Sequence, residues 1–457
     1  MIGVGVGRDA GRPQTRERPE LAASAVAWAS ALGLAVAVAF SFVTANPNLP
    51  HVALTLWLGR RLLGGAPADL LGRLGGVVAA LVERAGGEPA LALATAFAAL
   101  AAFALIAVRA SRVAGNVAGF AAAALAVLCS LDLLRPGGGM TNLAFAAALM
   151  LALDARTLLG AGLAALLAVV WCNAAPEGLL AAPLAAAWAF GSTLEGARGA
   201  RLREAWLGAA GCALATLATP AGAAFPKLAY EALRLDRDLV ALVPVHPVDV
   251  APAAYRVGFT LVVLGALAFG ARLRRAELPP LGFALLLALA NGAFLPLLGA
   301  VAGPALACAA RLPRAFCVAL VSAAACAAVG VSLETDRANA GQPYELVAQL
   351  AADGTSHRLF CEPLEWCSVA TAAAAPGLRP FMDGRVAEDP PALRKMQRAI
   401  GRVNAGWRAE VSRARIDTFL VTRNEALATL LGLDPHWRRI ASDERALVFV
   451  RAGGTKR

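Results

Sequence analysis

Residues 44–87 read TANPNLPHVALTLWLGRRLLGGAPADLLGRLGGVVAALVERAGG and follow the first long apolar run of the chain. They form the only sizeable polar insertion within the apolar two-thirds of the sequence. Over residues 52–63 and 67–84, apolar side chains recur at helical spacing with charged residues between them. Amphipathic helices of this kind suit a membrane surface better than a membrane interior. The insertion therefore predicts a surface loop that follows a membrane span.

The composition is typical of a membrane protein. Hydrophobic residues make up 59% of the 457 residues, charged residues only 16%, and the mean hydropathy is +0.63. Soluble globular domains have an apolar fraction near one half. The net charge of +11 comes largely from arginines in short segments between apolar runs, where they set topology. No compact basic domain with interleaved aromatic residues is present, so we expect contact with membrane lipids and no nucleic-acid partner.

Eleven apolar runs are predicted to be membrane-spanning helices, since a helix needs roughly 20 apolar residues to cross a bilayer. They are residues 21–43, 91–108, 117–134, 141–153, 158–172, 178–193, 205–217, 255–271, 280–290, 293–310 and 315–333. The arginines concentrate on one side of this arrangement if residues 1–20 are a cytoplasmic tail. With an odd number of spans, the loop 44–90 and the C-terminal region then lie outside the cytoplasm.

The composition changes after residue 333. Residues 334–457 are charged, contain no further apolar run, and alternate between helical and strand patterns. Helices are predicted over 344–352, 391–415 and 424–431, and strands over 357–361, 379–382, 416–421, 437–441 and 446–450. Such alternation indicates a small α/β domain. Cys361 and Cys367 could form a disulfide if this domain lies outside the cytoplasm, and the spacing of the cysteines matches no metal site.

Short motifs occur in order along most of the chain. They are Asn46-Pro47-Asn48 with Leu58-Gly59-Arg60; Leu134-Arg135-Pro136; Val170-Trp171-Cys172-Asn173 with Glu177-Gly178; Ala218-Thr219-Pro220-Ala221-Gly222; Phe381-Met382-Asp383-Gly384-Arg385; and Trp437 through Asp443 to Phe449-Val450-Arg451. In their order and their placement relative to the spans, these motifs resemble the GT-C superfamily of integral-membrane glycosyltransferases. The resemblance is to bacterial members whose multi-span region ends in an extracytoplasmic α/β tail.

This resemblance implies transfer of a sugar from a polyprenyl-phosphate donor to an acceptor at the outer face of the membrane. It also implies a multi-pass protein of the bacterial inner membrane with a cytoplasmic N-terminus and a periplasmic C-terminal domain. In such chemistry a carboxylate takes the proton of the acceptor hydroxyl, and cations stabilise the departing lipid phosphate. The sequence requires no cofactor, and whether the protein uses a divalent metal ion is an open question at this point.

The expected acidic residues are partly missing. Where relatives usually have aspartates in the first external loop, this chain has Asn46 and Asn48, and an amide cannot take a proton at neutral pH. Asp69 and Glu177 are the remaining carboxylates expected near the outer face, and both are candidate catalytic bases. Each also lies near a predicted helix N-terminus, where the helix dipole stabilises an acidic side chain without any catalytic role.

The candidate substrate-binding residues are polar groups expected on the same face. They are Asn46, Asn48, His51, Arg60, Arg135, Asn173, Asp383 and Arg385. Arg135, ahead of a proline and three glycines, could hold a lipid phosphate or extend to lipid headgroups. Asp383 and Arg385 could contact a sugar or phosphate, or could shape a turn. His51 alone does not make a metal site.

Two other functions stay open. The altered acidic motif favours a catalytically degenerate scaffold, or a subunit that binds lipid-linked glycans within a complex with another membrane protein. A transporter is the third alternative. It is less well supported, because the predicted spans show no paired charges and Asp132 and Asp154 lie near span ends.

Overall fold

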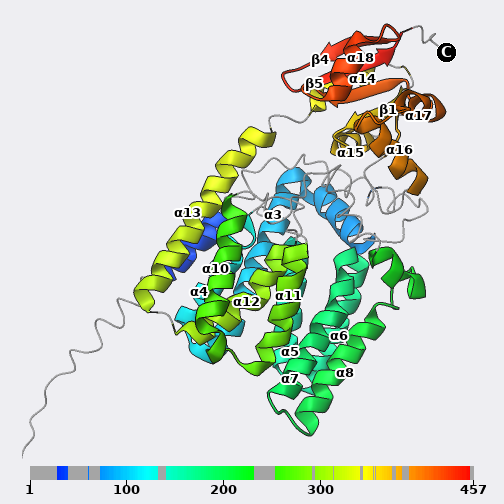
Figure 1. The fold of residues 1–457 in the computed structure, drawn as a ribbon. Helices are drawn as coiled ribbons and strands as arrows, with labels where there is room; N and C mark the ends of the chain where they lie inside the picture. The colour runs from blue at the N-terminus through cyan, green and yellow to red at the C-terminus, as the bar shows by residue number, and fades with distance from the viewer. Residues whose placement is uncertain are drawn as a thin grey trace, which may run out of the picture.

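The computed structural model describes residues 28–39, 60, 73–131, 140–230, 253–290, 294–311, 313–339, 343–353, 355, 357–372, 377–382 and 391–452. Over these ranges the chain forms a body of packed helices, followed by a smaller domain built on a β-sheet (Figure 1). Figure 1 shows this sheet domain beyond the end of the body at which the long helix α13 finishes.

The body is made of helices, some of them linked by short 3-10 turns. The helices are Trp28–Ala39, α3 (Arg73–Ala114), α4 (Asn116–Leu128), α5 (Met140–Asp154), α6 (Leu158–Ala174), α7 (Ala181–Leu194), α8 (Ala200–Ala215), α10 (Ala253–Phe269), α11 (Leu278–Ala290), α12 (Leu295–Ala310) and α13 (Arg314–Asn339). The 3-10 turns are η2 (Pro176–Leu180), η3 (Gly222–Ala224), η4 (Gly270–Arg272) and η5 (Arg275–Glu277). From α4 onward each of these helices overlaps one predicted apolar run, and the ends differ by up to six residues, as at α4, α8 and α13.

The second part of α3, Pro89–Ala114, is long and apolar enough to cross a bilayer alone. Several further apolar helices of 10–17 residues accompany it in the described part of the chain. Helices of that length are shorter than the roughly 20 residues of a full span. The number of eleven spans therefore stays a prediction.

Helix α3 consists of two parts. Residues 73–85 form a first part, here called the surface segment, and Pro89–Ala114 is the long apolar helix. The break between them lies at Gly86 and Gly87, whose backbone angles are non-helical, and a proline follows at position 89. Before the break, Leu74, Val78 and Leu81 are exposed to the outside of the protein. An apolar helix face that the protein leaves uncovered agrees with the predicted contact with a membrane surface.

The centre of the body is α4, which is buried along nearly its whole length. Its small residues and those of neighbouring helices allow very close approach of the backbones. A Cβ atom at Gly303 of α12 would lie 2.7 Å from the Ala122 carbonyl oxygen, and one at Gly119 would lie 2.7 Å from the Ala107 oxygen of α3. Helix packing through small residues is typical of proteins folded within lipid.

The sheet domain has its own hydrophobic core. Its elements are α14 (Tyr344–Ala352), β1 (His357–Glu362), α15 (Glu365–Ala372), β2 (Leu378–Pro380), α16 (Pro391–Gly401), α17 (Trp407–Arg413), β3 (Thr418–Thr422), α18 (Ala426–Leu433), β4 (Trp437–Ser442) and β5 (Ala446–Arg451). The strand order is β2-β1-β3-β5-β4. Strand β1 is parallel to β2 and β3, whereas β5 is antiparallel to β3 and β4. Cys361 and Cys367 form a disulfide.

Two features of this domain differ from the prediction. The single helix predicted over residues 391–415 is wrong, because the chain forms α16 and α17 with a break between them. Val403 and Gly406 in the break have positive φ angles of 53° and 85°, which a right-handed helix does not accommodate. Helix α15 was not predicted from the sequence, and it fills the connection between β1 and β2.

Candidate active site at the end of α6

A tight turn at the end of α6 fixes the position of Glu177. Pro176 begins η2, where its missing N–H loses no hydrogen bond. Gly178 then packs so closely on α6 that a Cβ atom there would lie 2.4 Å from the Cys172 nitrogen. Because any larger residue would collide with this backbone, the turn holds the Glu177 side chain directly beyond the helix end.

The Glu177 side chain faces the first turn of α5. There the Asn142 Oδ1 atom accepts a hydrogen bond of 2.8 Å from the Trp171 indole nitrogen. The Trp171 ring stacks on Phe145 with 6.0 Å between ring centroids. The Asn142 side chain also lies close enough to the Glu177 carboxyl to lower its pKa. Asn142 thus connects the carboxylate to rigid aromatic packing.

The Glu177 carboxylate has no cationic partner among the described residues. Its Oε2 atom is shielded from solvent and receives no hydrogen bond from that part of the chain. Burial raises the pKa of the Glu177 carboxyl, while the backbone N–H of Glu177 and the Asn142 amide lower it by smaller amounts. A carboxylate with a raised pKa and a free oxygen is well suited to accept a proton near neutral pH.

The surface segment of α3 reaches the same place. A Cβ atom at Gly75 would lie 2.7 Å from the Ala174 carbonyl oxygen at the end of α6. Asn173, predicted to bind substrate, donates from Nδ2 to the Ala218 oxygen at 3.0 Å and to a carbonyl one turn back in α6 at 2.8 Å. Its nitrogen therefore ties α6 to the segment after α8. The polar insertion of the sequence and Glu177 meet at one end of the body.

Three of the predicted site residues lie in the described part of the chain, namely Glu177, Asn173 and Arg60. Arg60 forms an ion pair with Glu83 of α3, so its guanidinium lies against the surface segment. The others lie outside the described residues; they are Asp69, Asn46, Asn48, His51, Arg135, Asp383 and Arg385. Asn142 was missed from the sequence, where its only signal is a lone amide at the start of an apolar run.

Within the described ranges, no group of three His, Cys, Asp or Glu side chains lies close enough together to hold a metal ion.

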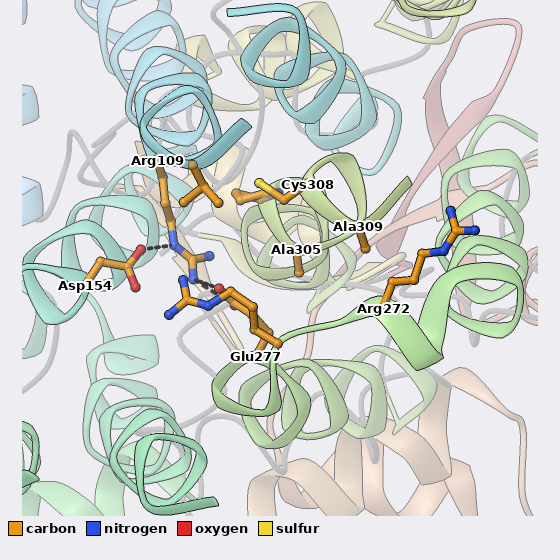
Figure 2. A pocket seen from close by; sticks show the side chains of 10 residues that line it. Arg109, Asp154, Arg272, Glu277, Ala305, Cys308 and Ala309 are labelled. Atoms are coloured by element: carbon orange, nitrogen blue, oxygen red, sulfur yellow. Dashed lines mark hydrogen bonds and ion pairs between the residues drawn. The ribbon is translucent and has the colours of Figure 1, made fainter. Parts of the chain in front are cut away.

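A second buried carboxylate lies at the opposite end of α5, and Figure 2 shows its surroundings. Arg109 of α3 donates from Nε to Asp154 at 2.6 Å, and from Nη2 to the two oxygens of Glu277 at 2.8 and 3.0 Å. Arg109 and Glu277 are both buried, and Arg272 points away from them (Figure 2). Arg109, Asp154 and Glu277 lie just outside the predicted spans 91–108, 141–153 and 280–290, so the expectation that the spans carry no paired charges stays a prediction. Helix α3 continues past residue 108 and takes Arg109 into the interior.

Further ion pairs surround this group. Glu195 accepts hydrogen bonds from Arg156 and, at 3.1 Å, from Arg274. A cavity of about 110 Å³ lies beside Arg109. Each of the three acids in this network has a cation within hydrogen-bond distance. The network therefore connects helix ends, and none of its carboxylates is an unpaired base.

No family model and no curated protein matches the sequence, but solved structures match the fold. ArnT from Cupriavidus metallidurans bound to undecaprenyl phosphate has a TM-score of 0.56 and 11% identity over 96% of this chain and 99% of that chain. The same protein in the apo state has a TM-score of 0.56 and 13% identity, over 93% and 98%. The oligosaccharyltransferase AglB from Archaeoglobus fulgidus, with an inhibitory peptide and a dolichol-phosphate, gives 0.50 and 12% over 86% and 69%.

The match to ArnT extends over nearly all of both chains, so it takes in the helical body and the sheet domain together. Identities of 11 to 13% show a shared fold and do not by themselves show shared chemistry. ArnT is a GT-C glycosyltransferase, and its fold combines a polytopic helical membrane region with a C-terminal domain. The predicted resemblance is confirmed at the level of structure: this chain has the fold of the GT-C integral-membrane glycosyltransferases.

Proposed function

We propose that this protein transfers a sugar from a polyprenyl-phosphate donor to an acceptor at the outer face of the membrane, with Glu177 as the catalytic base. The observation that carries the proposal is the Glu177 carboxyl, whose shielded Oε2 atom has no partner in the described part of the chain. It lies where the end of α6 meets the surface segment of α3, because Gly75 packs against the Ala174 carbonyl there.

The reaction needs few groups. The Glu177 carboxylate takes the proton of the acceptor hydroxyl while that oxygen bonds to the anomeric carbon of the sugar. The bond between this carbon and the phosphate oxygen breaks, and the lipid phosphate leaves with an added negative charge. Cations stabilise that charge. Arg60, whose side chain is 56% exposed beside α3, and Arg135 are the arginines proposed for this role.

The lipid donor is supported by what the structural neighbours contain. ArnT was solved with undecaprenyl phosphate and AglB with a dolichol-phosphate. Both compounds are polyprenyl phosphates that differ in chain, and both present one phosphate at the end of a long apolar tail. A protein of the same fold with an uncovered apolar helix face on α3 suits a ligand of this kind.

We place the protein in the bacterial inner membrane with residues 1–20 in the cytoplasm, residues 21–333 as the membrane region, and residues 334–457 as a periplasmic domain. The Cys361–Cys367 disulfide supports this side for the sheet domain, because disulfides persist in oxidising compartments. An epitope tag after residue 457 should be accessible from outside in spheroplasts. A tag that is reached only after permeabilisation contradicts the topology.

The decisive experiment replaces the base. Glu177→Gln keeps the size of the side chain and removes its ability to take a proton, so transfer from a polyprenyl-phosphate sugar should fall roughly 10²- to 10⁴-fold. The matched control is Glu83→Gln, which changes a glutamate of the nearby surface segment. The protein is reconstituted in lipid nanodiscs, and thermal unfolding checks that both variants are folded.

Asp69 and the non-catalytic alternative are tested in the same assay. If Glu177→Gln retains transfer and Asp69→Asn abolishes it, Asp69 is the base. The replacement of the expected aspartates by Asn46 and Asn48 favours a scaffold that binds lipid-linked glycan. In that case both substitutions are silent, whereas removal of residues 334–457 disrupts a membrane-protein complex.

A further inference from the structure

The carboxyl ends of β1 and β3 form a switch point in the sheet domain. From β1 the chain runs through α15 to β2 on one side, and from β3 it runs through α18 to β4 on the other. In open α/β sheets, connections that diverge from neighbouring parallel strands leave a crevice in which ligands bind. Strand β1 ends at Glu362 and β3 at Thr422, whose Oγ1 donates to the Glu362 backbone oxygen at 3.1 Å.

Buried polar atoms without partners lie at this switch point. Gln397 of α16 is only 1% exposed, and its Nε2 atom donates to the Cys361 oxygen at 3.0 Å. The Oε1 atom of Gln397 and the Oε2 atom of Glu362 are shielded from solvent and have no hydrogen-bond partner in the described part of the chain. Buried polar groups are nearly always hydrogen-bonded in folded proteins. These two oxygens, one on α16 and one at the end of β1, therefore suggest a ligand that bonds to them.

Gly401 preserves the space for the Glu362 carboxyl. A Cβ atom at this position would lie 2.3 Å from Glu362 Oε2, so any side chain there would displace the carboxyl. Gln397 and Gly401 are four residues apart on α16 and therefore share one helix face. Burial and the neighbouring Glu425 raise the pKa of Glu362 to about 7. Near neutral pH this group can therefore both donate and accept hydrogen bonds.

The charges at the switch point restrict the ligand. The Gln397 oxygen and the ionised form of Glu362 repel a phosphate or carboxylate placed against them. Arg402, which follows the end of α16, lies close enough to lower the pKa of Glu362, so a cationic ligand meets positive charge. A hydroxyl group is uncharged and both donates and accepts, which matches these atoms.

We propose that the switch point between β1 and β3 binds a neutral polyhydroxyl ligand, a sugar ring, whose hydroxyls bond to Gln397 Oε1 and to the Glu362 carboxyl. This site belongs to the sheet domain and is built from residues other than those around Glu177. It holds a sugar whether or not the helical body transfers one. The sheet domain is thereby a glycan-binding domain attached to the membrane region.

The test uses the full chain in nanodiscs and three probes that share one ring. Glucose is neutral, glucosamine carries an ammonium group, and glucose 6-phosphate is an anion. Saturation-transfer NMR should show saturable binding of glucose, with the other two bound more weakly. Gly401→Ala, which places a methyl group against Glu362, should weaken glucose binding roughly fivefold or more. Gly432→Ala is the control, because a Cβ atom at Gly432 meets nothing within 4 Å.

A second arm requires no variant. In the wild-type protein, glucose should slow hydrogen exchange of backbone amides in α16 and at the end of β3, and it should do so equally in Glu177→Gln protein. Sugar binding that depends on Glu177 and not on Gly401 would mean that only the site at α6 takes sugar. The proposal is overturned if glucose does not bind, if a charged probe binds better, or if the Gly401→Ala and Gly432→Ala proteins bind glucose equally.

Discussion

Glu177 and Glu277 are both carboxylates of the helical body with oxygens shielded from solvent, and they differ in their partners. Glu277 receives two hydrogen bonds from Arg109, which also holds Asp154. Glu177 lies beside the neutral Asn142 amide, and its Oε2 atom has no partner among the described residues. The first carboxylate is fixed by charge, whereas the second keeps an oxygen free for a ligand or a proton.

Helix α5 connects the two sites, because Asn142 lies in its first turn and Asp154 is its last residue. The two residues are separated by roughly 18 Å along the helix axis at 1.5 Å per residue. One end of α5 thus helps to close an ion-pair network, and the other positions a carboxyl that no cation neutralises. The difference separates a group that holds the fold together from a group that is free to react.

The largest effect is expected from Arg109→Leu. The substitution leaves Glu277 and Asp154 without their shared cation, and breaking a buried ion pair in this way costs roughly 3–5 kcal/mol of stability. We expect a lower yield of folded protein and a clearly lower unfolding temperature in nanodiscs. Arg272→Leu is the control, since Arg272 lines the same cavity but points away from both acids. Equal stability of the two variants would show that the network does not hold the body together.

A third buried carboxyl, Glu362 of the sheet domain, tests how a weakly paired acid affects folding. Its pKa of about 7 in the folded chain lies above the value of an unfolded glutamate, so folding favours the protonated form. The contribution of this carboxyl to stability should therefore be fully present below pH 4.5 and be lost as the pH rises to 7, by on the order of 3 kcal/mol.

Chemical unfolding of wild-type protein and of Glu362→Gln over this pH range measures the effect. The variant has no carboxyl at this position and should lose most of the slope. A slope that is the same in both proteins would mean that another group is responsible for it.

Asn142→Leu should move the pH dependence of transfer. The substitution removes the donor that partly offsets the effect of burial on Glu177, so the pKa of that carboxyl rises further. Because the base acts in its ionised form, the acidic limb of the activity profile should shift to higher pH. Phe145→Leu is the control, since it removes the ring that stacks on Trp171 and leaves the Asn142 side chain itself unchanged. An unchanged limb in Asn142→Leu would remove Glu177 from the role of base.

Periodicity predicted much of this fold. Helix α14 has the predicted bounds, and α6 and β5 differ from theirs by one or two residues, because each has a regular pattern and clear end signals. The helix predicted over residues 391–415 is longer than α16. The chain leaves the helix in a break that contains Val403 and Gly406, and their positive φ angles are not visible in the hydrophobic pattern. The number of spans does not follow from hydropathy when most apolar helices are shorter than a bilayer is thick.

The site was predictable only in part. Glu177 could be named because few carboxylates lie near that end of the apolar runs. Asn142 could not, since its role depends on Trp171 and Glu177, which meet it only when α5 and α6 pack together. The predicted span 91–108 ends one residue before Arg109, whereas in the structure this side chain is buried and paired with two acids.

The smallest change in stability is expected at Arg60, whose side chain is 56% exposed in its ion pair with Glu83. Exposed ion pairs contribute less than about 1 kcal/mol, so Arg60→Ala and Glu83→Ala should both leave the unfolding temperature nearly unchanged. Their effects on transfer should differ. If Arg60 contacts the donor phosphate, its loss raises KM for the polyprenyl-phosphate sugar, whereas loss of Glu83 frees the guanidinium and does not raise it. Equal KM values in the two variants would leave Arg60 as part of the surface segment alone, and the cation for the leaving phosphate would have to come from elsewhere on that face.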